Sequence, residues 1–489
     1  MLFFFASSKV MSKFARDRLF AQRTGSTRSV WKVSSMTVRH KWRTICPRRR
    51  DRRFVRGVAK CALARGDPRA LQPATNRRFN VQRNIAGKFG RARFAVQRRS
   101  GFIAMALLAT ALAGGCAHLG GSTLTPTAAN PSPWASPTAT MRWNEYAIDL
   151  IARNQSGQLG SARTLAYLNL AINNAIVAAQ KQGRQPAGAG SGAAATVLAF
   201  AFPKDEAAIN ARLAGETASL GAANRADFTA GVDIGRAAAT EVIATAKSDR
   251  LAAEWTGTVP TGADKWASQL KPARPPLAPA LGGMRPFFMS SGSEFRTAPP
   301  AADSPQFRAA LIEVRTTADN RSEEQLRVAQ YWEALQGGFA AGMWNEQARG
   351  AISARGLSEA ESARTLAMLH MAIIDVLIAS HDTKYTTWVP RPAQLDPAIT
   401  MTIGLPNHPS FPSNGAAINT VAGVILDTQF PEQGGRFSAM AKQGSDSRYF
   451  SGIHYRFDVE GGEVIGRKVA ERALKTRVPA DKAFVPLGK

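Results

Sequence analysis

The clearest regularity in the chain is a stripe of apolar residues spaced three and four positions apart within residues 362–380. This spacing places the stripe on one face of an α-helix. Segments of the same kind recur across residues 141–480, so we predict an all-α body built from helices that each bury one face. The residues of the stripe are Leu366, Leu369, Ile373, Val376 and Leu377.

Two stretches of this body repeat each other in register. One begins with WNEYAIDLIARNQSGQLGSARTLAYL at Trp143, and the other with WNEQARGAISARGLSEAESARTLAML at Trp344. They share Trp-Asn-Glu and then Ser-Ala-Arg-Thr-Leu-Ala at one constant offset. This match indicates an internal duplication.

The duplication predicts two packed, duplicated helical bundles. Further on, Gly231–Arg236 parallels Gly462–Arg467, and we pair Gly192 with Gly415 in two segments that each end in Phe-Pro. The predicted parts are an amino-terminal scaffold half at residues 141–255, a Pro-rich crossover at 256–305 and a carboxy-terminal half at 306–480.

Positive charge is concentrated at the amino end. The first hundred residues hold 27 of the 63 Lys and Arg and 3 of the 35 Asp and Glu, which is +24 of the net +28. Such basicity can indicate nucleic-acid binding, but these arginines are scattered, without a repeat or zinc-ligand spacing. We therefore predict no nucleic-acid partner. We interpret residues 1–95 as sequence translated upstream of the true start, or as a basic extension or targeting peptide.

Residues 96–116 have the pattern of a bacterial export signal. Two arginines precede an apolar run of about fifteen residues and a small-residue exit, and the run is shorter than the roughly twenty residues of a membrane span. Two cleavage sites stay open, an ordinary one at Ala111–Ala113 and a lipoprotein site with Cys116 as the lipidated residue. We expect an exported protein that is periplasmic or lipid-anchored, with membrane contact only through that anchor.

The mature chain offers few groups for metal or nucleotide chemistry. Residues 117–140 are rich in Gly, Ser, Thr and Pro and predict a tether. No cysteine follows Cys116, which excludes a disulfide framework and a thiolate metal site from the body. The sequence also lacks a Walker or Rossmann glycine loop and a His-Glu-x-x-His helix.

Three short clusters of polar and charged residues follow one another near the carboxy terminus: KYTTWVPRP at Lys384–Pro392, FPSNGAA at Phe411–Ala417 and SRYFSGIHYRFD at Ser447–Asp458. Ammonium and guanidinium groups neutralise the oxygens of a tetrahedral oxyanion, and the N–H groups of a turn donate to them. The clusters therefore predict an oxyanion site. Its candidate binding residues are Lys384, Arg391, Ser413, Asn414, Gly415 and Arg448.

His454 and Asp458 are the candidate catalytic residues of the third cluster. Positions four apart share one face of a helix, so the Asp458 carboxylate can accept a hydrogen bond from one ring nitrogen of His454. That bond fixes the tautomer and leaves the lone pair of the other nitrogen able to bond to the central atom of the oxyanion.

The order of the clusters resembles the three-part signature of the superfamily that unites vanadium-dependent haloperoxidases, type 2 phosphatidic acid phosphatases and bacterial acid phosphatases. The first and third clusters match at every defining position. The duplicated layout resembles the haloperoxidase branch, and so do the runs Met284–Arg296 and Ser322–Trp332. The resemblance implies vanadate as the cofactor, with His454 as its axial ligand, and hydrogen peroxide and halide as substrates.

The middle cluster departs from the family pattern. Where the family has Pro-Ser-Gly-His, this chain has Pro-Ser-Asn-Gly, and Gly415 stands at the position of the acid–base histidine. General acid–base catalysis contributes about two to four powers of ten in rate. His408 is the candidate substitute for this proton-transfer group.

Two other functions stay open. In an acid phosphatase, His454 would attack a phosphomonoester and form a phosphohistidine, so that phosphate takes the place of vanadate. Alternatively, the protein binds phosphate or vanadate without turnover, because Gly415 replaces the motif histidine.

Overall fold

The computed structural model describes residues 138–336, 339–476 and 482–484. The predicted basic extension, the export segment with Cys116 and residues 117–137 of the tether lie outside this part of the chain. The predicted end of the tether at residue 140 is wrong by two residues, because helix α2 already begins at Ala139.

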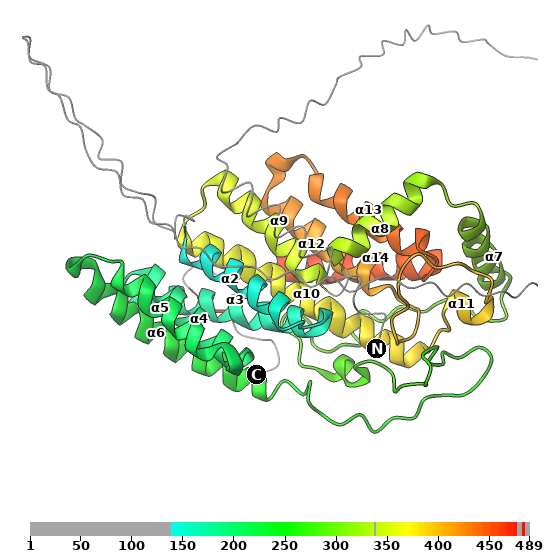
Figure 1. Ribbon diagram of the computed structural model, residues 1–489, viewed down its shortest axis with the longest axis horizontal. Helices are drawn as coiled ribbons and strands as arrows, with labels where there is room; N and C mark the ends of the chain where they lie inside the picture. Colours follow the sequence, from blue (N-terminus) through cyan, green and yellow to red (C-terminus); the bar gives the residue numbers. More distant parts are fainter. Residues whose placement is uncertain (1–137, 337–338, 477–481, 485–489) are drawn as a thin grey trace, which may run out of the picture. The chain divides into compact units, whose positions relative to one another are not determined.

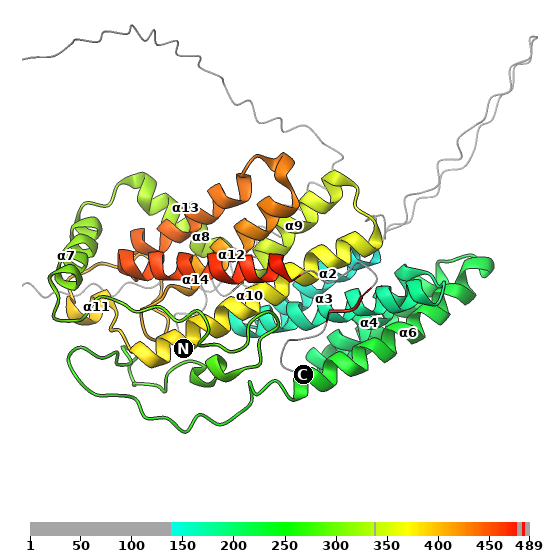
Figure 2. The same ribbon diagram turned by 180° about the vertical axis from the view of Figure 1, so that it is seen from behind.

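Every regular element among the described residues is helical, which confirms the predicted all-α class (Figures 1 and 2). The first half consists of α2 (Ala139–Arg153), α3 (Gln158–Lys181), α4 (Pro186–Ala201), η1 (Pro203–Asp205), α5 (Glu206–Ala218) and α6 (Ala222–Lys247). The second half consists of α9 (Ala340–Arg355), α10 (Glu359–Thr387), α11 (Pro392–Leu395), α12 (Asn414–Gln429), η3 (Pro431–Gln433), α13 (Arg436–Phe450) and α14 (Arg456–Lys475). Between the halves lie an irregular segment with η2 (Pro279–Gly283), then α7 (Pro305–Asp319) and α8 (Glu323–Gln336).

The two halves repeat one order of helices, in which α2, α3, α4, α5 and α6 correspond to α9, α10, α12, α13 and α14. Trp143 of α2 and Trp344 of α9 are both fully buried. Helices α4 and α12 have 16 residues each, and each is followed directly by Phe-Pro. Counted from that shared end, Ala187 is the counterpart of Gly415. The predicted pairing of Gly192 with Gly415 is therefore wrong by five residues.

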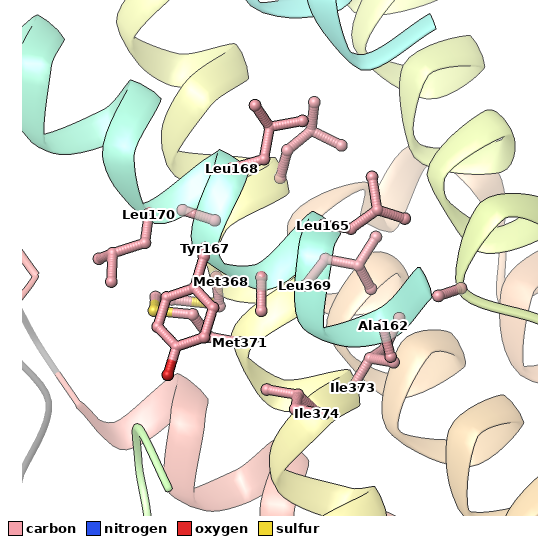
Figure 3. Packing of buried hydrophobic residues seen from close by; sticks show 14 of the residues in the cluster. Ala162, Leu165, Tyr167, Leu168, Leu170, Met368, Leu369, Met371, Ile373 and Ile374 are labelled. Atoms are coloured by element: carbon pink, nitrogen blue, oxygen red, sulfur yellow. The ribbon is translucent and has the colours of Figure 1, made fainter. Parts of the chain in front are cut away.

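Helix α10 lies at the centre of the body, where it contacts α3 of the first half and α12 and α14 of the second (Figure 1). Figure 3 shows the contact between the two halves, with Leu165 of α3 near Leu369 of α10 and Ala162 of α3 near Ile373. All four side chains are fully buried. The apolar stripe predicted from spacing thus forms the seam between the halves.

Buried amides also join the halves. Asn144 pairs with Asn169 in the first half at 2.8 Å, and Asn345 pairs with Nε2 of His370 in the second at 2.8 Å. Asn345 Nδ2 then donates to Asn144 Oδ1 across the seam at 2.7 Å. Because burial lowers the pKa of His370 to about 3, this ring is neutral at pH 7. Buried polar groups that are matched in this way fix the relative position of two helix pairs.

One segment among the described residues, Glu359–Leu395, is long and apolar enough to cross a membrane. It contains α10, and 94% of its most apolar window is buried inside the body.

The close contact of α4 with α6 gives a test of the fold. A Cβ atom at Gly235 of α6 would overlap the backbone of Ala189 and lie 2.6 Å from the nitrogen of Ala193. We expect Gly235→Ala to lower the free energy of unfolding by about 1–3 kcal/mol, because the two backbones would have to separate. Denaturant unfolding measures this change.

Gly215→Ala in α5 is the matched control, because a Cβ there meets no atom within 4 Å. It should leave the stability unchanged or raise it by up to about 1 kcal/mol through helix propensity. Equal stabilities for the two variants would contradict the described packing of α4 on α6.

Candidate functional site

The three clusters of the sequence meet at one end of the second half. Lys384 is in the last turn of α10, Arg391 precedes α11, and Ser413 is the N-cap of α12, so that Asn414 and Gly415 open that helix. Arg448 is in the last turn of α13, and His454 lies in the connection to α14. The convergence that the sequence predicted is therefore present in the fold.

His454 and Asp458 make the predicted contact, with Nδ1 of His454 2.8 Å from Oδ2 of Asp458. The expected geometry was different, however, because α14 starts at Arg456 and only Asp458 lies on it. The carboxylate of Asp458, in the first turn, reaches back to His454 and also accepts from the backbone N–H of Tyr455 at 3.1 Å. His454 and Asp458 are therefore brought together by the turn at the start of α14, and not by lying on one face of a helix.

His454 is neutral in this setting. Burial, aided by the charges of Arg391 and Lys384, lowers its pKa well below the usual range. Nδ1 therefore carries the proton that it donates to Asp458, and Nε2 accepts from Nη1 of Arg391 at 3.1 Å. Burial raises the pKa of Asp458 to about 6, so this carboxyl is ionised at pH 7.

Arg391 is fully buried and connects three parts of the site. Its guanidinium donates to the carbonyl oxygens of His408 and Ile453 at 3.1 and 2.8 Å, in addition to the bond with His454. Its Nη2 lies 3.1 Å from Nδ1 of His408. Because burial and the nearby cations lower the pKa of His408 well below its usual range, Nδ1 of the neutral ring can accept from Arg391.

Lys384 holds the loop that leads into α12. Its ammonium donates to the carbonyl oxygens of Pro409 and Ser410 at 2.8 and 2.9 Å, and to that of Pro412. Burial and the charge of Arg391 lower the pKa of Lys384. Because three carbonyl acceptors require three protons, the side chain is nevertheless a charged ammonium. Backbone carbonyl groups accept all three of these protons, and direct contact of Lys384 with an oxyanion stays a prediction.

The residues of the middle cluster have different surroundings. The hydroxyl of Ser413 accepts from the N–H of Ala416 at 3.4 Å, which caps α12, and this side chain is fully buried. Asn414 and Gly415 line a cavity of about 110 Å³, and the buried Oδ1 of Asn414 has no hydrogen-bond partner among the described residues. The role predicted for Ser413 as an oxyanion donor stays a prediction.

Arg448 is the cation best placed to bind an anion in this cavity. Its Nε donates to Ser447 at 3.0 Å and its Nη1 to Oε2 of Glu333 at 3.0 Å. Its Nη2 is buried and has no hydrogen-bond partner within the described part of the chain. A buried guanidinium N–H without an acceptor is costly, so this group fits an oxyanion ligand.

Two of the cavity-lining residues that were not predicted carry polar side chains, Glu333 and Gln158. Glu333 comes from α8, and Gln158 comes from the first turn of α3 in the first half, which we predicted to be scaffold only. A second cavity of about 150 Å³ adjoins the first and shares Gln158, His408 and Asn414 with it. Glu333 lies in the run SEEQLRVAQYW, which carried the family resemblance, but no spacing within this run marked a charged residue of the site.

The charges of the site sum to a small positive value. Lys384, Arg391 and Arg448 give +3, and the ionised carboxylates of Asp458 and Glu333 give −2, so the net charge is +1 with His408 and His454 neutral. A cleft lined by net positive charge attracts an anion more strongly than a flat exposed surface does.

Comparisons with known proteins agree with this geometry at the level of the fold. The structure is similar to a bacterial vanadium-dependent iodoperoxidase, with a TM-score of 0.59 and 19% identity over 69% of this chain and 96% of that chain. It is also similar to a bacterial vanadium-dependent chloroperoxidase in its apo form, with a TM-score of 0.52 and 13% identity over 64% of this chain and 93% of that one. The holo form gives a TM-score of 0.51 and 13% identity over 70% and 94%.

No family model and no curated protein matches the sequence. The likeness therefore shows that this chain has the helical fold of vanadium-dependent haloperoxidases. It confirms the resemblance in fold that the motifs predicted.

The position of Gly415 gives a test of the cavity. A Cβ atom there would lie 2.9 Å from Cδ and 3.2 Å from Cγ of Arg448, so Arg448 would have to move. We expect Gly415→Ala to weaken orthovanadate binding by roughly tenfold, because Nη2 would lose its position and a charged hydrogen bond depends on geometry. Calorimetric titration measures the dissociation constant.

Gly404→Ala is the control, because Gly404 lines the same cavity but a Cβ there meets no atom within 4 Å. It should bind orthovanadate as the unaltered protein does. If both variants bind equally well, the position of Arg448 does not govern oxyanion affinity.

Proposed function

We propose that this protein is a haloperoxidase-type enzyme whose site in the second half binds vanadate through His454. The observation that carries the proposal is the pairing of a neutral His454 with the buried Asp458, 2.8 Å away, at a cavity lined by Arg448. Vanadate bound there would supply the centre that takes up hydrogen peroxide and transfers oxygen to a halide.

The residues of the site each support this chemistry in a defined way. Asp458 holds the proton of His454 on Nδ1, so that the lone pair on Nε2 can bond to the central atom once Arg391 turns to the oxyanion. Arg448 offers the N–H of Nη2, which has no partner among the described residues, and the backbone at Asn414 and Gly415 lies at the N-terminus of α12, where anions are stabilised. Burial of these groups keeps competing water away.

The cavity beside His454 is large enough for small reactants. Its volume of about 110 Å³ suits a tetrahedral oxyanion and one small co-reactant such as hydrogen peroxide, and the adjoining cavity of about 150 Å³ gives a phosphomonoester further room. The preference for the haloperoxidase therefore comes from the likeness in fold to bacterial vanadium-dependent haloperoxidases and not from cavity size.

The phosphatase is the second candidate because the same His454 could attack a phosphoryl group. In that case Arg391 and Arg448 would stabilise the charge of the transition state, and water would release phosphate from the histidine. Binding without turnover is the third candidate, because Gly415 cannot transfer a proton. A titration with orthovanadate, followed by bromide oxidation with peroxide and hydrolysis of a chromogenic phosphomonoester, separates the three.

The function of His454 gives the direct test. We expect His454→Ala to abolish turnover in both assays, because it removes the ring whose Nδ1 proton is held by Asp458 and whose Nε2 can bond to the central atom. The variant leaves the buried carboxylate of Asp458 without this partner and should be less stable, so activity is compared at a temperature at which thermal unfolding shows the variant to be folded. Turnover by His454→Ala at the unaltered rate would refute both enzymatic functions.

We also propose that the protein is exported, either into the periplasm after ordinary cleavage or anchored by a lipid at Cys116, on the basis of its signal-like segment. Mass spectrometry of the protein from its native cells should find a mature terminus at or after residue 114, with an acylated Cys116 in the lipoprotein form. A mature terminus before residue 95 would contradict export through this segment.

A further inference from the structure

In this chain, position 415 carries no proton-transfer group. Gly415 has no side chain, and Arg448 fills the space beside it, so that Cδ of Arg448 would lie 2.9 Å from a Cβ atom at this position. Arg448 is in turn held in place by its hydrogen bonds to Ser447 and Glu333. A proton-transfer group for this cavity must therefore reach it from another element.

Glu333 of α8 is the only acidic residue among the described residues that line the cavity. Its Oε2 accepts from Arg448 at 3.0 Å, and no hydrogen bond of Oε1 is found within the described part of the chain. The side chain is 37% exposed, so its carboxylate can exchange a proton with solvent. Asp458 cannot take this role, because it is fully buried and bound to His454.

We propose that Glu333 is the proton-transfer residue of this site and takes over the task of the histidine that the chain lacks at Gly415. The inference rests on the proposed function, because it needs a reaction at the oxyanion. Oε1 of Glu333 would take a proton from hydrogen peroxide as the peroxide oxygen bonds to the central atom of the oxyanion. The carboxylic acid would then return this proton to the hydroxide displaced from that atom, which leaves as water, and Glu333 ends the step ionised.

His408 is less suited to the task. Its Nδ1 lies 3.1 Å from Nη2 of Arg391, and its ring packs against the ring of His381, with 5.8 Å between the two ring centroids. Burial and two cations keep it neutral, so its protonated form, which a general acid needs, is disfavoured. Glu333 is 37% exposed, whereas His408 is buried, so Glu333 is the more accessible of the two to solvent.

The experiment compares Glu333→Gln with Glu324→Gln. Glu324 lies on the same helix and pairs with Arg327 at the surface, so its variant removes an equivalent charge outside the site. Glutamine at 333 can still accept from Nη1 of Arg448 but cannot take up a proton. For Glu333→Gln, we expect kcat to fall by about 100- to 10,000-fold, while orthovanadate binds at least as tightly as to the unaltered protein. Glu324→Gln should match the unaltered protein in both measurements.

A third variant separates proton transfer from positioning. Glu333→Ala leaves space in which an added small carboxylate such as formate can bind, and formate should restore part of the lost rate. Orthovanadate and phosphate affinities, measured by calorimetry without turnover, show whether Arg448 has stayed in place.

The outcomes separate the role of Glu333 from the proposed function. Proton transfer by Glu333 would be overturned, with the proposed function intact, if Glu333→Gln keeps its kcat. The same conclusion would follow if the variant loses kcat and orthovanadate affinity to the same extent. Absence of formate rescue would also count against it. If the unaltered protein binds orthovanadate but turns over in neither assay, both the enzymatic function and the role of Glu333 are wrong.

Discussion

The burial of the Lys384 ammonium is the constraint on which the rest of the site depends. A cation without water needs an acceptor for each of its protons, and the carbonyl oxygens of Pro409, Ser410 and Pro412 supply them. These bonds hold the loop before α12 against the end of α10. They thereby fix where Ser413 caps α12 and where Asn414 and Gly415 meet the cavity. Lys384 was expected to bind the oxyanion directly, and in the structure it fixes the loop that leads to the cavity-lining residues Asn414 and Gly415.

The other buried charges follow from the same requirement. Breaking one partner of a buried ion pair commonly costs about 3–5 kcal/mol, so each cation is matched. Arg391 is satisfied by carbonyls and by two histidines, and Asp458 offsets both it and Lys384 electrostatically. Arg448 alone keeps a buried N–H without a partner among the described residues. Among the buried cations of the described residues, Arg448 is therefore the one with an N–H left to bind an anion.

Contacts between residues close together in the chain could be predicted from the sequence, whereas contacts between distant segments could not. The four-residue spacing of His454 and Asp458 predicted their hydrogen bond, although the bond forms across the start of α14 and not along one helical face. The helical stripe of α10 also predicted its buried seam. The backbone acceptors of Lys384 could not be predicted, since carbonyl groups leave no mark in a sequence. Glu333 reaches Arg448 across 115 positions, and only the tertiary packing of α8 on α13 brings them together.

A comparison of the two halves explains why the second half carries a charged site and the first half does not. In the first half, Gln185, Pro186 and Ala187 occupy the positions of Ser413, Asn414 and Gly415. The connection before α4 is only residues 182–185, whereas residues 388–413 join α10 to α12. The longer connection carries Arg391, His408 and the carbonyls that bind Lys384. The last turn of α3 carries Lys181, which is exposed and needs no such loop to satisfy its ammonium. The long connection of the second half therefore supplies Arg391, His408 and the acceptors of Lys384, and the duplicated helices give it rigid support. Arg448 on α13 and His454 before α14 complete the site from other elements.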